Sequence, residues 1–272
     1  MKDKLKAAIY GLAIGDALGV PVEFRQRGTF NISDMVGFGT HNQQPGTWSD
    51  DTSMTIATCD SIRECDGIDR LDMYERFREW IFEGKYAIDG NVFDFGITTA
   101  CAIRQGYGEY SERSNGNGSL MRILPLVFTD ASTEEIEAVS AITHAHEISK
   151  IGCVYYVEIA RMLLEGFKLK AILEDLDFVS PYERLSYIHT LDEDDIQSTG
   201  YVVHTLEAAL WALSTTDNFK DAVLKAVNLG SDTDTVGAVT GGLAGIMYGL
   251  EGIPKEWIDT LRGKELINSC LF

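Results

Sequence analysis

Residues 230–245 read GSDTDTVGAVTGGLAG, an acidic cluster followed by a run rich in glycine and alanine. Asp232 and Asp234 are two residues apart, so on one regular helix they would face different sides. They can converge only on a turn or at the start of a helix. Gly230 before them and the Gly- and Ala-rich run after them predict a turn that enters a tightly packed, buried helix. Polar groups at the mouth of such a helix either cap it or bind something.

A second acidic cluster, SDDT, occupies residues 49–52. Carboxylate and hydroxyl oxygens are the ligands that Mg²⁺, Mn²⁺ and Ca²⁺ prefer. If the fold joins the two clusters, their like charges need cations to neutralise them. Each cluster alone is equally typical of a helix N-cap or a solvated turn, so both interpretations stay open at this point. An EF-hand loop beginning at Asp232 is excluded, because Val236 and Leu243 would stand where oxygen ligands are needed.

The composition is that of an ordinary globular protein with a strong acidic excess. The 272 residues are 45% hydrophobic and 24% charged, and the net charge is −19. We expect one domain over residues 1–272. Without a basic stripe, binding to nucleic acid through its phosphates is disfavoured.

The cysteines and the apolar runs bear on the compartment. The five cysteines are scattered without a Cys-x-x-Cys pair, which disfavours a disulfide framework or a zinc ribbon and favours a reducing cytoplasm. Asp16 interrupts the apolar N-terminal run, and no convincing cleavage site for a signal peptide follows it. The apolar stretch 236–250 is too short to span a bilayer. We therefore expect a cytoplasmic protein without a membrane role.

Helical periodicity dominates the rest of the chain, and alternating strand patterns are scarce. Apolar residues at i, i+3 and i+4 spacing predict helices around residues 71–81, 148–163 and 203–213. Acidic first turns after residues 130–133 and 215–217 predict two more helix starts. The prediction is an all-α protein of about a dozen helices. Residues 28–46 are expected to form a surface loop, and residues 191–199 a second, acidic one.

Two further segments could bind a ligand. Residues 114–119 read SNGNGS, whose glycines permit positive φ and whose exposed amides could cradle a phosphate, although a plain Asn-Gly turn is the simpler alternative. His144 and His146 lie at i and i+2, so they do not share a helix face as a metal-binding pair would. His144 could hydrogen-bond a phosphate or ribose oxygen, or serve only as a structural histidine.

The order of these motifs carries more information than any one of them. Gly15-Asp16-Ala17-Leu18-Gly19, Pro21-Val22-Glu23, WSDDT, GNGSLMR, Thr143-His144 and GSDTDTVGAVTGGLAG follow one another over nearly the whole chain. In this order and spacing the sequence resembles the ADP-ribosylglycohydrolase family, and most closely its dinitrogenase-reductase-activating type. The resemblance implies a compact orthogonal multi-helix bundle with two Mg²⁺ or Mn²⁺ ions in a cleft. It also implies cleavage of the N- or O-glycosidic bond between ADP-ribose and a modified side chain.

The resemblance assigns roles to individual residues. Glu23 and Asp51 correspond to the catalytic carboxylates, with Glu23 as the acid/base. Asp94 corresponds to a contact of the scissile ribose, and Ser49 stands where threonine is usual. The implied metal ligands are Ser49, Asp50, Asp51, Asp232, Asp234 and Thr235. The implied diphosphate and ribose contacts are Asn115, Gly116, Asn117, Gly118, Ser119 and His144.

The first choice of function is a hydrolase of ADP-ribosyl-arginine. Hydrolysis of O-linked ADP-ribose, as in ADP-ribosyl-serine, poly(ADP-ribose) or O-acetyl-ADP-ribose, is the alternative within the same chemistry. A non-catalytic ADP-ribose-binding protein on this fold is an alternative from another class. A metal-dependent phosphoesterase is disfavoured, because the histidines and basic phosphate clamps it requires are missing. The expected partner is an ADP-ribosylated protein or a small molecule that contains ADP-ribose, bound by a monomer.

Overall fold

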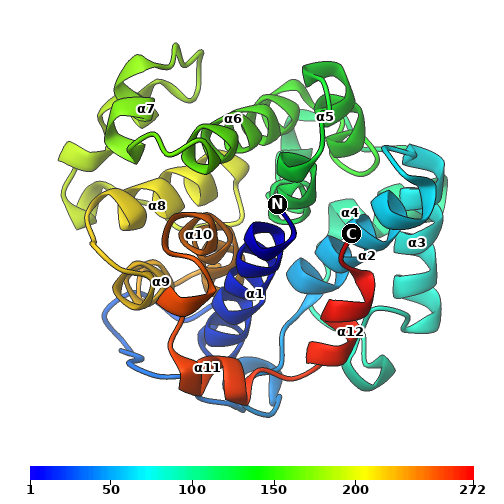
Figure 1. Cartoon of the computed structure of the whole chain (residues 1–272), viewed down its shortest axis with the longest axis horizontal. Helices are drawn as coiled ribbons and strands as arrows, with labels where there is room; N and C mark the ends of the chain where they lie inside the picture. The colour runs from blue at the N-terminus through cyan, green and yellow to red at the C-terminus, as the bar shows by residue number, and fades with distance from the viewer.

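The glycines of the opening stretch bring two helices into backbone contact. In the computed structural model, which describes all 272 residues, helix α10 (Thr233–Tyr248) packs along helix α1 (Lys2–Gly19) in the middle of the molecule (Figure 1). A Cβ atom on Gly11 would lie 2.2 Å from the carbonyl oxygen of Gly241, and one on Gly15 would lie 2.0 Å from that of Gly237. Only glycine permits this approach, so the predicted tightly packed helix is confirmed.

Ten further α-helices surround this central pair. The α-helices are α1 (Lys2–Gly19), α2 (Asp50–Cys65), α3 (Arg70–Glu83), α4 (Ile97–Gln105), α5 (Thr133–Ser140), α6 (Glu147–Leu164), α7 (Leu169–Asp175), α8 (Val202–Ser214), α9 (Phe219–Val227), α10 (Thr233–Tyr248), α11 (Lys255–Thr260) and α12 (Lys264–Cys270). Short 3₁₀ helices are η1 (Val20–Val22), η2 (Gly39–His41), η3 (Ile88–Gly90), η4 (Glu112–Ser114), η5 (Leu120–Arg122), η6 (Leu124–Phe128), η7 (Glu183–Thr190), η8 (Glu193–Asp195) and η9 (Leu250–Gly252).

The all-α prediction is confirmed, since the only β pairing consists of three isolated bridges. The expected helices correspond to α3, α6 and α8, and the start of α5 carries a full capping box between Ser132 and Glu135. The buried face of α3 differs from the predicted one. Leu71 begins the predicted apolar stripe of α3 but is 78% exposed, and the residues of α3 that are buried are Met73, Phe77 and Trp80.

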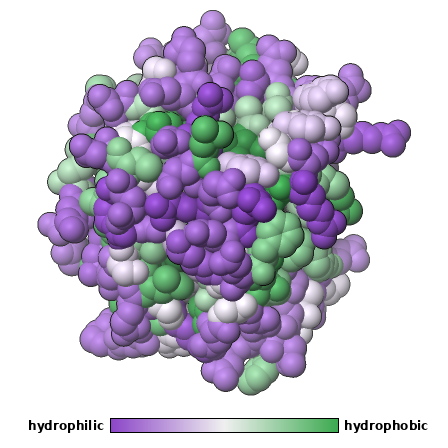
Figure 2. All heavy atoms as spheres, turned by 90° about the vertical axis from the view of Figure 1, so that its right-hand side faces the viewer, coloured by the Kyte–Doolittle hydropathy of each residue, from purple (hydrophilic) through white to green (hydrophobic).

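One continuous hydrophobic core of 77 buried residues links the helices. Lys2–Val22 is long and apolar enough to cross a bilayer by composition, but 94% of its most apolar window is buried inside the protein, so it serves as the central core helix. All five cysteines are free, as expected. On the face drawn in Figure 2, hydrophilic residues predominate and apolar ones are scattered between them, in keeping with the acidic composition.

Candidate active site

The contact between α1 and α10 brings the two acidic clusters together. The Thr233 hydroxyl donates to the carbonyl oxygen of Gly19 over 2.8 Å, which joins the end of α1 to the start of α10. The α2 helix starts beside this junction. The Thr235 hydroxyl lies 3.4 Å from Oδ2 of Asp51, although the two residues are 184 positions apart in the sequence. The clusters therefore form one buried acidic centre.

A buried aspartate of α1 decides between the cap and the metal interpretations. Asp16 is fully buried and accepts hydrogen bonds from the backbone amides and the hydroxyls of Ser49 and Thr52, at 2.6–3.1 Å. It thus caps α2 from another helix. Ser49 and Asp232, the N-cap residues of α2 and α10, make no capping bond with their own side chains. The simple cap interpretation of the two clusters is therefore wrong.

Two carboxylate oxygens in this centre have no partner. Oδ1 of Asp51 and Oδ2 of Asp234 are buried and make no hydrogen bond. Oxygens of Asp51 and Asp234 lie within 4.8 Å of one another and of Asp16, and oxygens of Asp234, Asp232 and Glu23 form a second such group. Because Asp16 already uses both its oxygens as acceptors, it is better placed to support a cation site than to ligate it. The free oxygens that could hold cations come from Asp51 and Asp234.

The electrostatics of the centre favour proton or cation uptake. Burial raises the pKa of Asp51 and of Asp234 well above the ordinary value, and neighbouring carboxylates raise both further. Burial, followed by the charge of Asp94, also raises the pKa of Asp50. Burial also raises the pKa of Asp232, but hydrogen bonds to its carboxylate oppose this rise, including one of 2.9 Å from Nδ2 of Asn117. Bound cations would offset the mutual repulsion of these carboxylates, so the charge distribution is consistent with a metal site.

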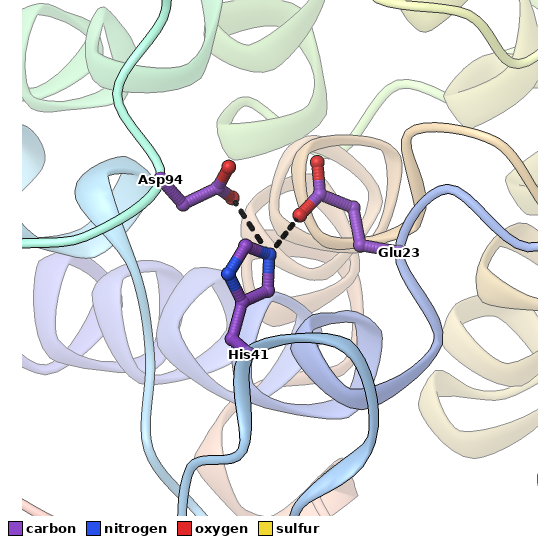
Figure 3. A group of neighbouring side chains, drawn as sticks. All are labelled: Glu23, His41 and Asp94. Atoms are coloured by element: carbon purple, nitrogen blue, oxygen red, sulfur yellow. Dashed lines mark hydrogen bonds and ion pairs between the residues drawn. The ribbon is translucent and has the colours of Figure 1, made fainter.

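Glu23, His41 and Asp94 form a second cluster (Figure 3), and Glu23 connects it to Asp232 and Asp234 of the acidic centre. Nε2 of His41 is hydrogen-bonded to Oε2 of Glu23 and lies 3.7 Å from Oδ2 of Asp94. Burial and then Asp94 raise the pKa of Glu23 to about 10. Asp94 has a φ of 55° and Phe24, next to Glu23, has a φ of 62°. Left-handed backbone at non-glycine residues is strained, and such strain concentrates at functional sites.

A cleft of about 380 Å³ opens above these carboxylates. Of the predicted site residues it is lined by Glu23, Asp50, Asp94, Gly116, Asn117, Gly118, His144, Asp232 and Thr235. Ser49, Asp51 and Asp234 lie buried and do not line it. Two others have their side chains engaged elsewhere: Asn115 bonds the Glu112 carbonyl and the Ser149 hydroxyl, and Ser119 bonds Ser140.

Residues 114–119, the Gly-Asn loop, contribute Gly116, Asn117 and Gly118 to the lining of the cleft and lead into a 3₁₀ helix, η5. Neither Gly116 nor Gly118 has positive φ, so the backbone freedom that the sequence offered is not used. The glycines provide space instead. A Cβ atom on Gly118 would lie 2.8 Å from Cε1 of His144. The amides of Gly116 and Gly118 donate to no protein group, which leaves them free for an anionic ligand.

Sequence reasoning overlooked two residues of the site. Asp16 stands in the first of the motifs that carry the family resemblance but was given no role of its own, although a carboxylate in a buried helix stripe needs hydrogen-bond donors and thereby indicates a functional site. His41 lies in residues 28–46, which were expected to form a surface loop. That expectation is wrong in part, because Ile32 is buried and His41 turns inward to Glu23. No periodicity marks a histidine in an irregular segment, so no signal was available for it.

Comparisons with known proteins agree with this geometry. The family model for ADP-ribosylglycohydrolase matches residues 1–271. An ADP-ribosylarginine hydrolase, Tri1, of Serratia proteamaculans is 36% identical, with 98% of this chain and 77% of the relative covered. The ADP-ribosyl-[dinitrogen reductase] glycohydrolase of Rhodospirillum rubrum is 33% identical, with 95% and 90% covered. A solved ADP-ribosylglycohydrolase-related protein complex has a TM-score of 0.83 at 32% identity, covering 99% of this chain and 95% of that one. The chain therefore belongs to the ADP-ribosylglycohydrolase family and is an enzyme of that family.

Proposed function

We propose that this enzyme is a metal-dependent hydrolase that removes ADP-ribose from a modified arginine side chain of a protein. The observation that carries the proposal is the pair of unpartnered, buried carboxylate oxygens on Asp51 and Asp234 beneath the cleft. Relatives at 36% and 34% identity are named ADP-ribosylarginine hydrolases, which supports arginine as the linked side chain.

The residues of the centre fit divalent cations. Hard oxygen donors are what Mg²⁺ and Mn²⁺ prefer, and the donor set here is carboxylate and hydroxyl only. Two ions would be held by Ser49, Asp50, Asp51, Asp232, Asp234 and Thr235. When bound, such ions supply a site for the ribose diol and lower the pKa of a water molecule.

Glu23 is proposed as the acid/base. In the metal-free protein, burial and then Asp94 raise the pKa of Glu23 to about 10, and the protonated carboxyl group is the form that can protonate a leaving nitrogen. His41 is hydrogen-bonded to its carboxylate and lies 3.7 Å from Asp94, and Glu23 and Asp94 both line the cleft (Figure 3). Glycosidic cleavage needs such an acid together with an activated water.

The cleft offers donors for the anionic part of the substrate. Gly116, Gly118 and His144 line it, and the free amides of the two glycines and the ring of His144 are the groups proposed to hold the diphosphate and ribose. Without such donors, a diphosphate would be repelled by the surrounding carboxylates.

A release assay tests the proposal. ADP-ribosylated arginine and serine peptides are incubated with the enzyme in Mg²⁺, Mn²⁺ or chelator, and free ADP-ribose is measured. We expect release from the arginine peptide that needs a metal ion. Asp234→Asn should reduce it by roughly a hundredfold or more, because the variant loses a carboxylate ligand.

Asp66→Asn is the matched control. Asp66 is exposed, has a φ of 52° that asparagine tolerates, and lies at the far end of α2. This variant should keep full activity. Release from the serine peptide only would transfer the assignment to the O-linked substrates. Tight binding of ADP-ribose without release from either peptide would favour the non-catalytic alternative, and full activity of Asp234→Asn in chelator would refute the metal centre.

A further inference from the structure

Arg122 is a buried cation that the proposed chemistry does not use. It is fully buried, no carboxylate pairs with it, and its Nε and Nη1 atoms have no hydrogen-bond partner. Its guanidinium lies over the ring of Phe77, 4.6 Å from the centroid. A buried charge without a counter-ion destabilises the fold, so the contacts that it does make are of interest.

Those contacts lead to the cleft. Nη2 of Arg122 donates to the Thr143 hydroxyl over 2.8 Å, and that hydroxyl lies 2.9 Å from Nδ1 of His144. The edge of the His144 ring that carries Nε2 faces the Gly-Asn loop: a Cβ atom on Gly116 would lie 3.4 Å from Nε2. No protein group bonds Nε2, and His144 lines the cleft.

Arg122, Thr143 and His144 form a row of two hydrogen bonds, and the donor Arg122 determines the direction of both. A guanidinium has no acceptor, so the Thr143 oxygen must accept from Arg122. Thr143 is fully buried, and the only other partner of its hydroxyl is Nδ1 of His144. If Nδ1 carried a proton, the hydroxyl would accept twice and its own hydrogen would be left without an acceptor, at a cost in free energy. The row is fully satisfied only when Thr143 donates to an unprotonated Nδ1.

We infer that Arg122 and Thr143 hold His144 in its Nε2–H tautomer, as a fixed hydrogen-bond donor to an oxygen of the ligand's diphosphate or ribose. The identity of that ligand rests on the proposed function; the tautomer does not. Arg122 and Thr143 are positioning residues, because they act through His144. His144 is accordingly a donor and takes no part in proton transfer, which leaves that role to the carboxylates.

The surroundings of His144 agree with this assignment. Burial, and secondly the charge of Arg122, lower the pKa of His144 to about 3, so the ring stays neutral over the physiological range. The backbone is fixed as well. The amide of His144 donates to the Ser140 carbonyl over 3.0 Å, and Glu109 pairs with the residues on either side of His144 at 2.7 and 2.9 Å. A ring held in this way can direct one N–H toward one point in the cleft.

The tautomer can be read from the free protein. The ¹⁵N resonances of the imidazole nitrogens distinguish a protonated from an unprotonated nitrogen, and the chain has only five histidines, so His144→Gln identifies the signals. We expect protonated Nε2 and unprotonated Nδ1 for His144 throughout about pH 5 to 8. An Nδ1–H tautomer, or an imidazolium at the acidic end of this range, would overturn the inference without reference to any substrate.

A matched pair of variants tests the consequence for binding. Thr143→Val keeps the shape and removes the hydroxyl, whereas Thr143→Ser keeps the hydroxyl. ADP-ribose affinity is measured by calorimetry on the enzyme with Mg²⁺ present. We expect roughly tenfold weaker binding for Thr143→Val, the loss typical of one directed hydrogen bond, and affinity within about twofold of the original for Thr143→Ser.

The possible outcomes separate the inference from the proposed function. Equal affinity of both Thr143 variants, or no binding of ADP-ribose by the unmodified enzyme, would overturn the donor role of His144. An enzyme that shows the expected tautomer and variant pattern but releases ADP-ribose from no peptide would refute the proposed hydrolysis and leave the inference standing.

Discussion

Gly241 and Gly242 are neighbours on α10, and substitution by alanine should destabilise the protein at Gly241 and change its stability little at Gly242. A Cβ atom on Gly241 would lie 2.1 Å from the carbonyl oxygen and 2.8 Å from the carbonyl carbon of Gly11, which are backbone atoms of α1. A Cβ atom on Gly242 would meet only side-chain ends, at 2.8 Å from Cδ2 of Leu124 and 2.9 Å from the Tyr156 hydroxyl oxygen. Comparing the stability of the two alanine variants therefore distinguishes the effect of crowding against backbone atoms from that of crowding against side chains.

The magnitudes follow from two opposing effects. In a helix interior, Gly→Ala is worth about 1 kcal/mol of added stability. Overpacking of a dense core costs typically 1–3 kcal/mol, and more where the backbone itself must move. For Gly241→Ala we expect the upper end or beyond, a net loss of about 2 kcal/mol. For Gly242→Ala the two effects should nearly cancel, to within about 1 kcal/mol.

Thermal denaturation followed by circular dichroism, in chelator, measures the difference. With a shift of about 2–4 °C per kcal/mol for a domain of this size, Gly241→Ala should melt roughly 4–8 °C below the unmodified protein. Gly242→Ala should stay within about 3 °C of it. Equal melting temperatures for the two variants, or a larger loss for Gly242→Ala, would refute the assignment of Gly241 to the backbone contact between α1 and α10.

Two further predictions concern the acidic centre. Burial raises the pKa of Asp16 from 3.8 to about 7 and that of Glu23 from 4.5 to about 10, so the metal-free native state binds more protons than the unfolded chain. The free energy of unfolding of the metal-free protein should therefore fall as the pH rises from about 5 to 9. Added Mg²⁺ or Mn²⁺ should raise the melting temperature more at pH 9 than at pH 6. A metal-free stability that rises over this range would contradict the assignment of raised pKa values to these carboxylates. Asp16→Ala removes the acceptor that caps α2, for an expected loss of about 0.5–2 kcal/mol in urea denaturation at pH 8, and an unchanged denaturation midpoint would show that Asp16 is not the cap.

The sequence by itself determined the local features of this protein. Apolar spacing predicted α6 and α8, and the spacing of Asp232 and Asp234 predicted a helix start followed by a buried, glycine-rich helix. The order of the motifs identified the family. These features depend on neighbouring residues or on the linear order of the chain, so a single sequence contains them.

Only the tertiary structure decided which carboxylate oxygens are free to bind a cation and which side chains are hydrogen-bonded to one another. Asp16 and Asp51 are both buried aspartates, yet Asp16 has its oxygens occupied by Ser49 and Thr52, whereas Oδ1 of Asp51 is left free. His41 reaches Glu23 from an irregular segment, and Arg122 is linked to His144 through the hydroxyl of Thr143. Hydrogen-bond saturation and burial arise from contacts between residues that are far apart in the chain, and no local pattern encodes them.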